Sequence, residues 1–225
     1  MRWKSRPAAE GASRLEQARS EMVTQQLLRR GIGDRRVLAA MGKVPRERFI
    51  PEDAVDLAYS DQALSIRLGQ TISQPYMVAL MTQALELAGE ERVLEVGTGS
   101  GYQAAILAEL CREVYTVERV AELSEAASQL LTELGYTNTH CKVGDGSLGW
   151  AEAAPYDGIV VTAAGPIIPP ELVEQLKEGG RLVMPVGDRH SQTLVTATKS
   201  GDELKETWLC QCVFVPLIGE NGWKQ

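Results

Sequence analysis

Residues 95–101, with the sequence Glu-Val-Gly-Thr-Gly-Ser-Gly, constrain the fold of this chain more than any other segment. They follow a short apolar run at residues 92–94 and lead into a helical pattern at residues 102–108. This order predicts a strand, a tight glycine loop and the start of a helix. Glycines let a ligand approach bare backbone, and a helix N-terminus offers it free N–H groups. We therefore expect a nucleotide-like cofactor at this loop.

The spacing of the glycines indicates which kind of cofactor. A dinucleotide-binding loop has the pattern G-x-G-x-x-G. Here Gly101 comes only two places after Gly99, Tyr102 stands where that pattern needs glycine, and the acid Glu95 lies two residues before Gly97. E-x-G-x-G-x-G resembles motif I of the S-adenosylmethionine-dependent methyltransferases, whose cofactor has no phosphate but carries an ammonium and a sulfonium group. By this resemblance the cofactor-binding candidates of the loop are Glu95, Gly97, Thr98, Gly99 and Gly101.

Further segments follow in the order that such a site needs. Residues 113–118 predict the next strand, and an acid at its end, Glu118, can accept hydrogen bonds from both ribose hydroxyls. Asp145 and Gly146 follow the stretch 139–143 and are cofactor-binding candidates, with Asp145 placed to hold the adenine amino group. A buried-looking strand at residues 155–162 completes the set. Together these pieces disfavour the alternative, an α/β domain with incidental turns.

From residue 91 onward, strands and helices alternate. We expect strands at residues 91–96, 114–118, 139–143, 157–161 and 180–186, and two more at 192–198 and 206–215. We expect helices between them at residues 101–110, 120–134 and 170–177. This alternation predicts an α/β fold with a doubly wound, mostly parallel, seven-stranded Rossmann-like methyltransferase sheet, and ligands at the carboxyl ends of its strands.

The segment before this alternation is predicted to be helical. Residues 1–13 are polar and indicate a flexible tail. Residues 14–30 carry a helical pattern that Gly31 ends, Asp34 can cap a second helix, and Pro75 begins a third. The fold therefore has an added N-terminal helical region.

Charge and cysteine content disfavour several classes of protein. The formal net charge is −7, and lysine and arginine supply most of the affinity for a nucleic-acid backbone. The four cysteines show no C-x-x-C spacing and there are two histidines, so we expect no metal site. Residues 1–17 lack the apolar stretch of a signal peptide, and no apolar run could span a membrane. We expect a soluble cytoplasmic protein that binds neither nucleic acid nor membrane, and we favour a monomer.

The polar loop upstream of the glycine loop points to one family. Residues 68–75, Leu-Gly-Gln-Thr-Ile-Ser-Gln-Pro, run directly into a helix that begins with proline. Together with Val-Pro-Arg-Glu-Arg-Phe at 44–49, Ala-Tyr-Ser-Asp at 58–61 and the glycine loop, this segment closely resembles the protein-L-isoaspartate O-methyltransferases. The likeness covers about residues 14–218. It continues at residues 144–146, 154–157, 161–164, 185–187 and 214–217.

The resemblance implies repair of age-damaged proteins. Asparagine and aspartate convert through a succinimide to isoaspartate, in which the backbone runs through the side-chain carbon. Enzymes of this family methylate the misplaced α-carboxylate, and the ester closes to a succinimide that opens partly to normal aspartate. The resemblance therefore implies isoaspartyl proteins and peptides as partners and S-adenosylmethionine as cofactor. It also implies a sheet whose last two strands exchange order relative to other methyltransferases.

Hydroxyl side chains of the polar loop are candidates for holding the acceptor. A carboxylic acid with a pKa of about 4 is ionised at neutral pH, so this nucleophile needs no general base. By resemblance, Ser73 matches the family's active-site serine, Thr71 lies at the edge of the cofactor, and Gln70 is a candidate substrate-binding residue. The alternative for Ser73 is a hydroxyl in the N-cap region of the helix that begins at Pro75. The alternative for Glu95 is a carboxylate that only orders the loop amides.

The apolar C-terminal stretch, residues 213–217, also fits the family. The resemblance implies that Val215 and Pro216 help to form the cleft for the substrate peptide, and the alternative is an ordinary sheet strand. Val213 stands where the family has an arginine before the phenylalanine, so any contact of that arginine is missing here. We divide residues 14–225, as a single catalytic domain, into N-terminal helices with the active-site loop (14–75), a cofactor-binding core (76–198) and a C-terminal strand with a substrate-cleft segment (199–225).

Competing functions share the same cofactor site. One is a methyltransferase acting on another acceptor, and the other is a non-catalytic protein that binds S-adenosylmethionine. A nucleic-acid methyltransferase fits less well, because the chain has neither an N/D-P-P-Y/F motif nor a Pro-Cys pair.

Overall fold

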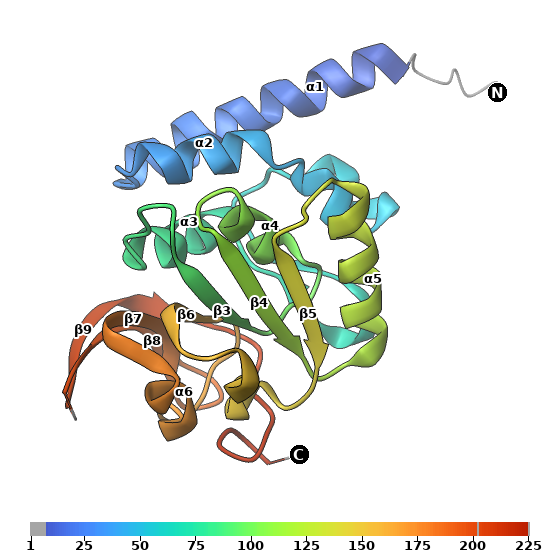
Figure 1. The fold of residues 1–225 in the computed structure, drawn as a ribbon. Coiled ribbons are helices and arrows are strands. Elements are labelled where there is room, and N and C mark those ends of the chain that lie inside the picture. Colours follow the sequence, from blue (N-terminus) through green and yellow to red (C-terminus); the bar gives the residue numbers. More distant parts are fainter. Residues whose placement is uncertain (1–7, 202, 225) are drawn as a thin grey trace.

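The computed structural model describes residues 8–201 and 203–224, with side chains from residue 13 onward. Its centre is a seven-stranded sheet with the order β5-β4-β3-β6-β7-β8-β9 (Figure 1). The strands are β3 (Arg92–Val96), β4 (Glu113–Glu118), β5 (Thr139–Val143), β6 (Tyr156–Val161), β7 (Leu176–Gly187), β8 (Gln192–Ser200) and β9 (Glu203–Cys212). The predicted fold class is confirmed.

The sheet is parallel except at its C-terminal end. β5, β4, β3, β6 and β7 pair in parallel, whereas β8 pairs antiparallel with both β7 and β9. Parallel neighbours need crossover connections. These contain α4 (Tyr102–Ala108), α5 (Ala121–Glu133) and α6 (Pro170–Glu174). The carboxyl ends of β3, β4 and β6 therefore meet at one edge of the sheet.

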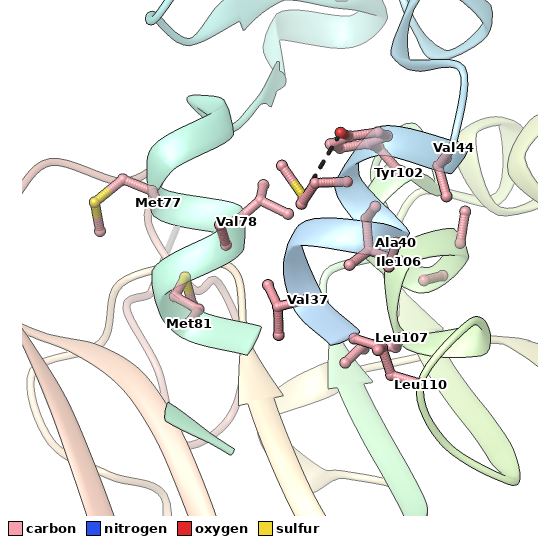
Figure 2. Close-up of a cluster of buried hydrophobic side chains, with 14 of the residues drawn as sticks. Val37, Ala40, Val44, Met77, Val78, Met81, Tyr102, Ile106, Leu107 and Leu110 are labelled. Atoms are coloured by element: carbon pink, nitrogen blue, oxygen red, sulfur yellow. Dashed lines mark hydrogen bonds between the residues drawn. The ribbon is translucent and has the colours of Figure 1, made fainter. Parts of the chain in front are cut away.

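The two faces of the sheet build two apolar cores, because successive strand residues point to opposite faces. Val93 packs into one core and its neighbour Leu94 into the other, and Val160 and Ile159 divide in the same way. The first core also contains residues of α2 (Arg35–Lys43), α3 (Pro75–Ala84) and α4. Figure 2 shows side chains of these three helices meeting, among them Val37 of α2.

The N-terminal helix begins earlier than the sequence pattern predicts. α1 spans Ala8–Glu21 and continues through a π-helical turn, Met22–Leu27, and a 3-10 turn, Leu28–Arg30. Residues 8–13 therefore belong to α1 and not to a flexible tail, because the alanines among them favour helix. Residues 1–7 of the predicted tail lie outside the described residues.

The predicted ends of the N-terminal helices are confirmed. Gly31 follows the 3-10 turn with a φ of 95°, the left-handed conformation that glycine tolerates. The side chain of Asp34 accepts hydrogen bonds from the backbone N–H groups of Arg36 and Val37 and so caps α2.

Two predicted boundaries near the C-terminal half of the sheet are wrong. α6 ends at Glu174 instead of residue 177, because β7 begins at Leu176, where Leu176 pairs with Tyr156 of β6. β9 ends at Cys212 instead of residue 215. The Phe214 N–H donates to Gln192 Oε1 at 2.9 Å, which draws the chain away from the β8 backbone.

Within residues 8–201 and 203–224, no helix is both long and apolar enough to cross a membrane. The same residues include no group of three or more histidine, cysteine or acidic side chains arranged to hold a metal ion.

Candidate active site

A cavity of about 300 Å³, called here the main cavity, opens at the carboxyl ends of β3, β4 and β6, where doubly wound sheets bind ligands. Residues far apart in the sequence form its walls. The predicted site residues among them are Gln70, Thr71, Gly97, Gly99, Glu118, Gly146, Val215 and Pro216. The structure thus brings most of the predicted residues together.

The glycine loop turns sharply because its glycines adopt φ values that other residues avoid. The φ angle is 97° at Gly97, 52° at Gly99 and 87° at Gly101. A Cβ on Gly97 would lie 2.5 Å from Thr162 Oγ1, beyond the end of β6. The loop also closes on itself through a hydrogen bond of 2.8 Å from Gly101 N–H to the Thr98 carbonyl. Its backbone therefore faces the cavity at a place that only glycine can occupy.

Glu118, at the end of β4, orders the glycine loop. Its side chain is 6% exposed, Oε2 accepts from the Gly99 N–H at 3.0 Å, and Oε1 accepts from the Val120 N–H at 3.0 Å. Each carboxylate oxygen has a second lone pair, so both can still accept from hydroxyls of a ligand. The ordering of loop amides, which was the alternative role for Glu95, therefore falls to Glu118.

Glu95 lies deeper and is fully buried, with 0% exposure. Its Oε2 accepts from the Thr116 hydroxyl at 2.5 Å, and that hydroxyl also contacts Thr98 Oγ1 at 2.6 Å. In the described part of the chain, Glu95 Oε1 is buried without a partner. Burial raises the pKa of Glu95 to about 8; the Thr116 hydrogen bond opposes the rise and the charge of Glu118 adds to it. A cationic ligand group beside this carboxyl would lower its pKa and favour the ionised form, so the unpaired oxygen suits such a group.

Because of Glu95, the stability of the fold should depend on pH. Its pKa rises from 4.5 to about 8 on folding, so between these values the folded state binds more protons. The stability contributed by the protonated carboxyl is full below pH 4.5 and is lost as pH rises through 8. At about 1.4 kcal/mol per pKa unit, we expect the wild type to lose a few kcal/mol relative to Glu95→Gln between about pH 5 and 8. Denaturant unfolding of both proteins measures this, and a pH-independent difference would contradict it.

The carboxylate of Asp145, expected to hold the adenine amino group, forms hydrogen bonds within the protein. Its Oδ1 accepts from Ser147 N–H at 2.9 Å and from Ser147 Oγ at 2.7 Å, and its Oδ2 accepts from Glu220 N–H at 2.7 Å. Burial works to raise the pKa of Asp145, but these hydrogen bonds outweigh it and the pKa is lowered. The carboxylate thus ties the C-terminal turn to residues 145–147, and its neighbour Gly146 lines the main cavity. The contact with adenine stays a prediction.

A short hairpin presents the polar loop. β1 (Leu64–Ser65) pairs antiparallel with β2 (Thr71–Ile72). Thr71 lies where three spaces adjoin: the main cavity, a second cavity of about 250 Å³, and an inner chamber of about 30 Å³ that Glu95 and Thr98 also line. Ser73 lines the second cavity and the inner chamber. The N-cap of α3 is Gln74 without a side-chain cap, so the structure does not give Ser73 the alternative role of capping this helix.

The C-terminal stretch runs between the two cavities. Phe214 lines the second cavity, and Val215 and Pro216 line the main cavity. The Ala164 N–H donates to the Val215 carbonyl at 2.8 Å, so the stretch runs beside the end of β6 instead of continuing β9. Val213 also lines the second cavity and is 75% exposed. The alternative of an ordinary sheet strand is therefore wrong for this stretch.

Several residues of the main cavity were missed by the sequence analysis. Thr162 and Ala163 follow β6, and Arg119 follows Glu118. Neighbouring parallel strands end at one edge, so the residues after β6 could have been found from the predicted sheet order. Leu217 and Ile218 also line the cavity, but they reach it through contacts with distant segments that have no local signal.

The residues present fit S-adenosylmethionine. The main cavity offers bare glycine backbone and a carboxylate at the end of β4 for ribose hydroxyls, and the inner chamber is lined by Glu95, whose unpaired oxygen can serve a cationic group. A seven-stranded sheet of this order, with an E-x-G-x-G-x-G loop after β3, defines an S-adenosylmethionine-dependent methyltransferase.

Comparison with known proteins narrows this class to a family. The family model for protein-L-isoaspartate(D-aspartate) O-methyltransferase (PCMT) matches residues 17–222. The protein-L-isoaspartate O-methyltransferase of Syntrophus aciditrophicus is 52% identical over 213 residues, which cover 93% of this chain and 98% of the relative. That of Dictyoglomus thermophilum is 57% identical over 194 residues, covering 86% and 88%.

Solved structures agree. A protein-L-isoaspartate O-methyltransferase structure superposes with a TM-score of 0.83 at 29% identity, over 91% of this chain and 67% of its own. A structure from Plasmodium falciparum, described as a beta-aspartate methyltransferase (PCMT) in complex with S-adenosyl-L-homocysteine, has a TM-score of 0.77 at 26% identity, over 89% and 98%.

The chain belongs to the protein-L-isoaspartate(D-aspartate) O-methyltransferase family. It is an S-adenosylmethionine-dependent enzyme that methylates isoaspartyl residues of proteins and so initiates their repair. The family, the activity and the cofactor expected from the sequence are confirmed.

Proposed function

We propose that the enzyme binds S-adenosylmethionine in the main cavity and the isoaspartyl peptide in the second cavity, with the acceptor carboxylate held at Ser73. The observation that carries this proposal is the position of the polar loop: Thr71 lines both cavities and the inner chamber, and Ser73 lines the second cavity and the inner chamber. A donor in one cavity and an acceptor in the other would meet at this loop.

Methyl transfer from S-adenosylmethionine to a carboxylate requires the protein mainly to position the two reactants. S-adenosylmethionine supplies a methyl group on a sulfonium, which is a good leaving group. The isoaspartyl α-carboxylate is ionised at neutral pH and needs no general base. The chain must orient this carboxylate and remove part of its water. The neutral hydroxyl of Ser73 can donate to one carboxylate oxygen without neutralising its charge.

The second cavity has the chemistry of a peptide site. Its walls include Gln62, Gln74 and Gln211, whose amides can both donate to and accept from a peptide backbone. Phe214 and Met77 add apolar surface for peptide side chains. These features support binding of an extended segment around the isoaspartyl residue.

We assign the other roles by position. Glu118 accepts from the ribose hydroxyls, Glu95 faces the cationic part of the cofactor, and Thr98 contributes backbone because its hydroxyl is taken by Thr116. Thr71 lies at the edge of the cofactor. Gly97, Gly99 and Gly146 line the main cavity as cofactor contacts, whereas Gly101 and Asp145 line neither cavity and keep their cofactor role from the sequence alone. Gln70, Val215 and Pro216 line the main cavity and not the second one, so as substrate contacts they would meet the peptide where it reaches the cofactor.

We further propose a cytoplasmic monomer that binds no nucleic acid, with residues 14–225 as one catalytic domain. Its four cysteines are free, as is usual in a reducing compartment, and its net charge is −7. Residues of this one chain line both cavities, which supports a site complete in a single copy.

Labelled S-adenosylmethionine and paired isoaspartyl and aspartyl peptides test the proposal. We expect a base-labile methyl ester on the isoaspartyl peptide alone. Ala63→Trp, at an exposed residue of the second cavity, should lower kcat/KM for this peptide by at least about tenfold and leave the Kd of S-adenosylhomocysteine unchanged. Label on the aspartyl peptide would favour another acceptor, and a weaker Kd in Ala63→Trp would contradict the separation of the two cavities.

A further inference from the structure

Arg46 is a fully buried cation outside both cavities. It lies in the 3-10 turn Arg46–Phe49 and is 0% exposed. Among the described residues, no carboxylate forms an ion pair with it. Burying an unpaired charge costs several kcal/mol, so its position requires strong compensating contacts.

The guanidinium of Arg46 holds two carbonyl groups from distant segments. Nε donates to the Ala58 carbonyl at 2.8 Å, and Nη2 donates to the Ser73 carbonyl at 2.8 Å. The central guanidinium carbon lies 4.8 Å from the ring centre of Tyr102, the first residue of α4 after the glycine loop. One side chain thus joins the turn, the segment at Ala58, the Ser73 loop and α4.

Other hydrogen bonds make the segment at residues 58–61 a firm support. The Tyr59 hydroxyl donates to Glu47, and Gln26 Nε2 donates to the Tyr59 carbonyl at 2.7 Å. Gln74 Nε2 donates to the Asp61 carbonyl at 2.9 Å. Arg46 therefore ties the backbone of Ser73 to a segment that is itself held at several points.

The contacts of Arg46 are strong for their kind. Hydrogen bonds from a charged donor are roughly twice as strong as those between neutral groups. The guanidinium keeps its charge, although burial lowers its pKa from the ordinary value. Its planar donors can reach two carbonyls at once, which the single ammonium of lysine matches only in part.

We propose that Arg46 is a positioning residue for methyl transfer, which fixes Ser73 in the orientation that holds the acceptor carboxylate. This inference rests on the proposed role of Ser73. Arg46 lines neither cavity, so it acts through the Ser73 backbone and not on the substrate. Through its hydrogen bonds to Ala58 and Ser73 it also links three separated blocks, residues 44–49, 58–61 and 68–75, beside the site.

Substitutions at Arg46 distinguish an effect on the positioning of Ser73 from an effect on the stability of the fold. Arg46→Met removes both hydrogen bonds and the charge, and we expect kcat to fall about 100-fold, the size of effect that a misplaced catalytic group produces. The KM for the peptide and the Kd of S-adenosylhomocysteine should change by less than about threefold. Arg46→Lys keeps a charged donor and should recover at least about tenfold of that loss. Val37→Ala, in the core at 2% exposure, is the matched control for lost stability and should keep wild-type kcat.

Two outcomes would overturn the inference. One is an Arg46→Met enzyme with kcat within about threefold of wild type, and the other is an Arg46→Lys enzyme no better than Arg46→Met. If Arg46→Met does not fold, a double-mutant cycle with Arg46→Lys and Ser73→Ala decides. If the fold losses in kcat of the two single variants do not multiply in the double variant, Arg46 acts through Ser73. If they multiply, the inference is overturned. Full activity of Ser73→Ala alone would instead overturn the proposed function.

Discussion

Ser73→Ala is expected to lower the turnover of an isoaspartyl peptide roughly 100-fold, because an acceptor that is no longer oriented loses about that much rate. The hydroxyl lies at the wall shared by the second cavity and the inner chamber, and it does not cap α3. Removing it should therefore cost catalysis and little stability. Initial rates with labelled S-adenosylmethionine measure the effect.

The control for Ser73→Ala is Ser65→Ala, at an exposed position of β1 in the same hairpin. It should keep turnover within about twofold of wild type. Calorimetry should give both variants the wild-type Kd for S-adenosylhomocysteine, since neither serine lines the main cavity. Unchanged turnover in Ser73→Ala would remove this residue from the mechanism.

Glu118→Ala should instead weaken cofactor binding, raising the Kd of S-adenosylhomocysteine roughly 100-fold. Hydrogen bonds to a charged group contribute about 1.5–3 kcal/mol each, and the proposed ribose role gives this carboxylate two of them, so the lower end alone corresponds to roughly 100-fold. The substitution also frees the Gly99 N–H that Glu118 holds in the loop. Titration calorimetry measures the change directly.

Glu113→Ala is the matched control for Glu118→Ala. Glu113 lies at the opposite end of the same strand, where it contacts Tyr115 and His140. Its removal should change the Kd by less than about twofold. An unchanged Kd in Glu118→Ala would refute the ribose role and leave Glu118 with the ordering of the loop alone.

Features with a local signal were predictable from the sequence. The glycine loop and the end of β4 are marked by residues next to apolar runs. The positions of Gly97 and Glu118, just after one strand and at the end of the next, could therefore be predicted before the fold was known. The inner strands were found for the same reason. The boundaries that failed depend on distant partners, as at Gln192, whose side chain binds the Phe214 N–H and ends β9 early.

The depth of the acidic residues could not be predicted. Glu95 and Glu118 both stand near the ends of predicted strands, but sheet packing buries Glu95 against Thr116 and leaves Glu118 beside the loop amides. Asp145 accepts a hydrogen bond from the backbone of Glu220, a contact between segments far apart in the sequence. Such contacts follow from the three-dimensional fold and carry no sequence pattern.

Arg46 shows the same limit most clearly. Its neighbours Glu47 and Arg48 are charged, and prolines bound the segment at Pro45 and Pro51, so residues 44–51 look like a connector. The fold buries Arg46 completely and turns its donors toward the carbonyls of Ala58 and Ser73. A residue that supports the active site can therefore look like a surface charge until its surroundings are known.

A crystal structure with S-adenosylhomocysteine and an isoaspartyl peptide tests the central claim most directly. We predict the cofactor in the main cavity with its ribose at Glu118, and an oxygen of the isoaspartyl α-carboxylate about 3 Å from Ser73 Oγ. A peptide whose α-carboxylate binds away from Ser73, or outside the second cavity, would contradict the account.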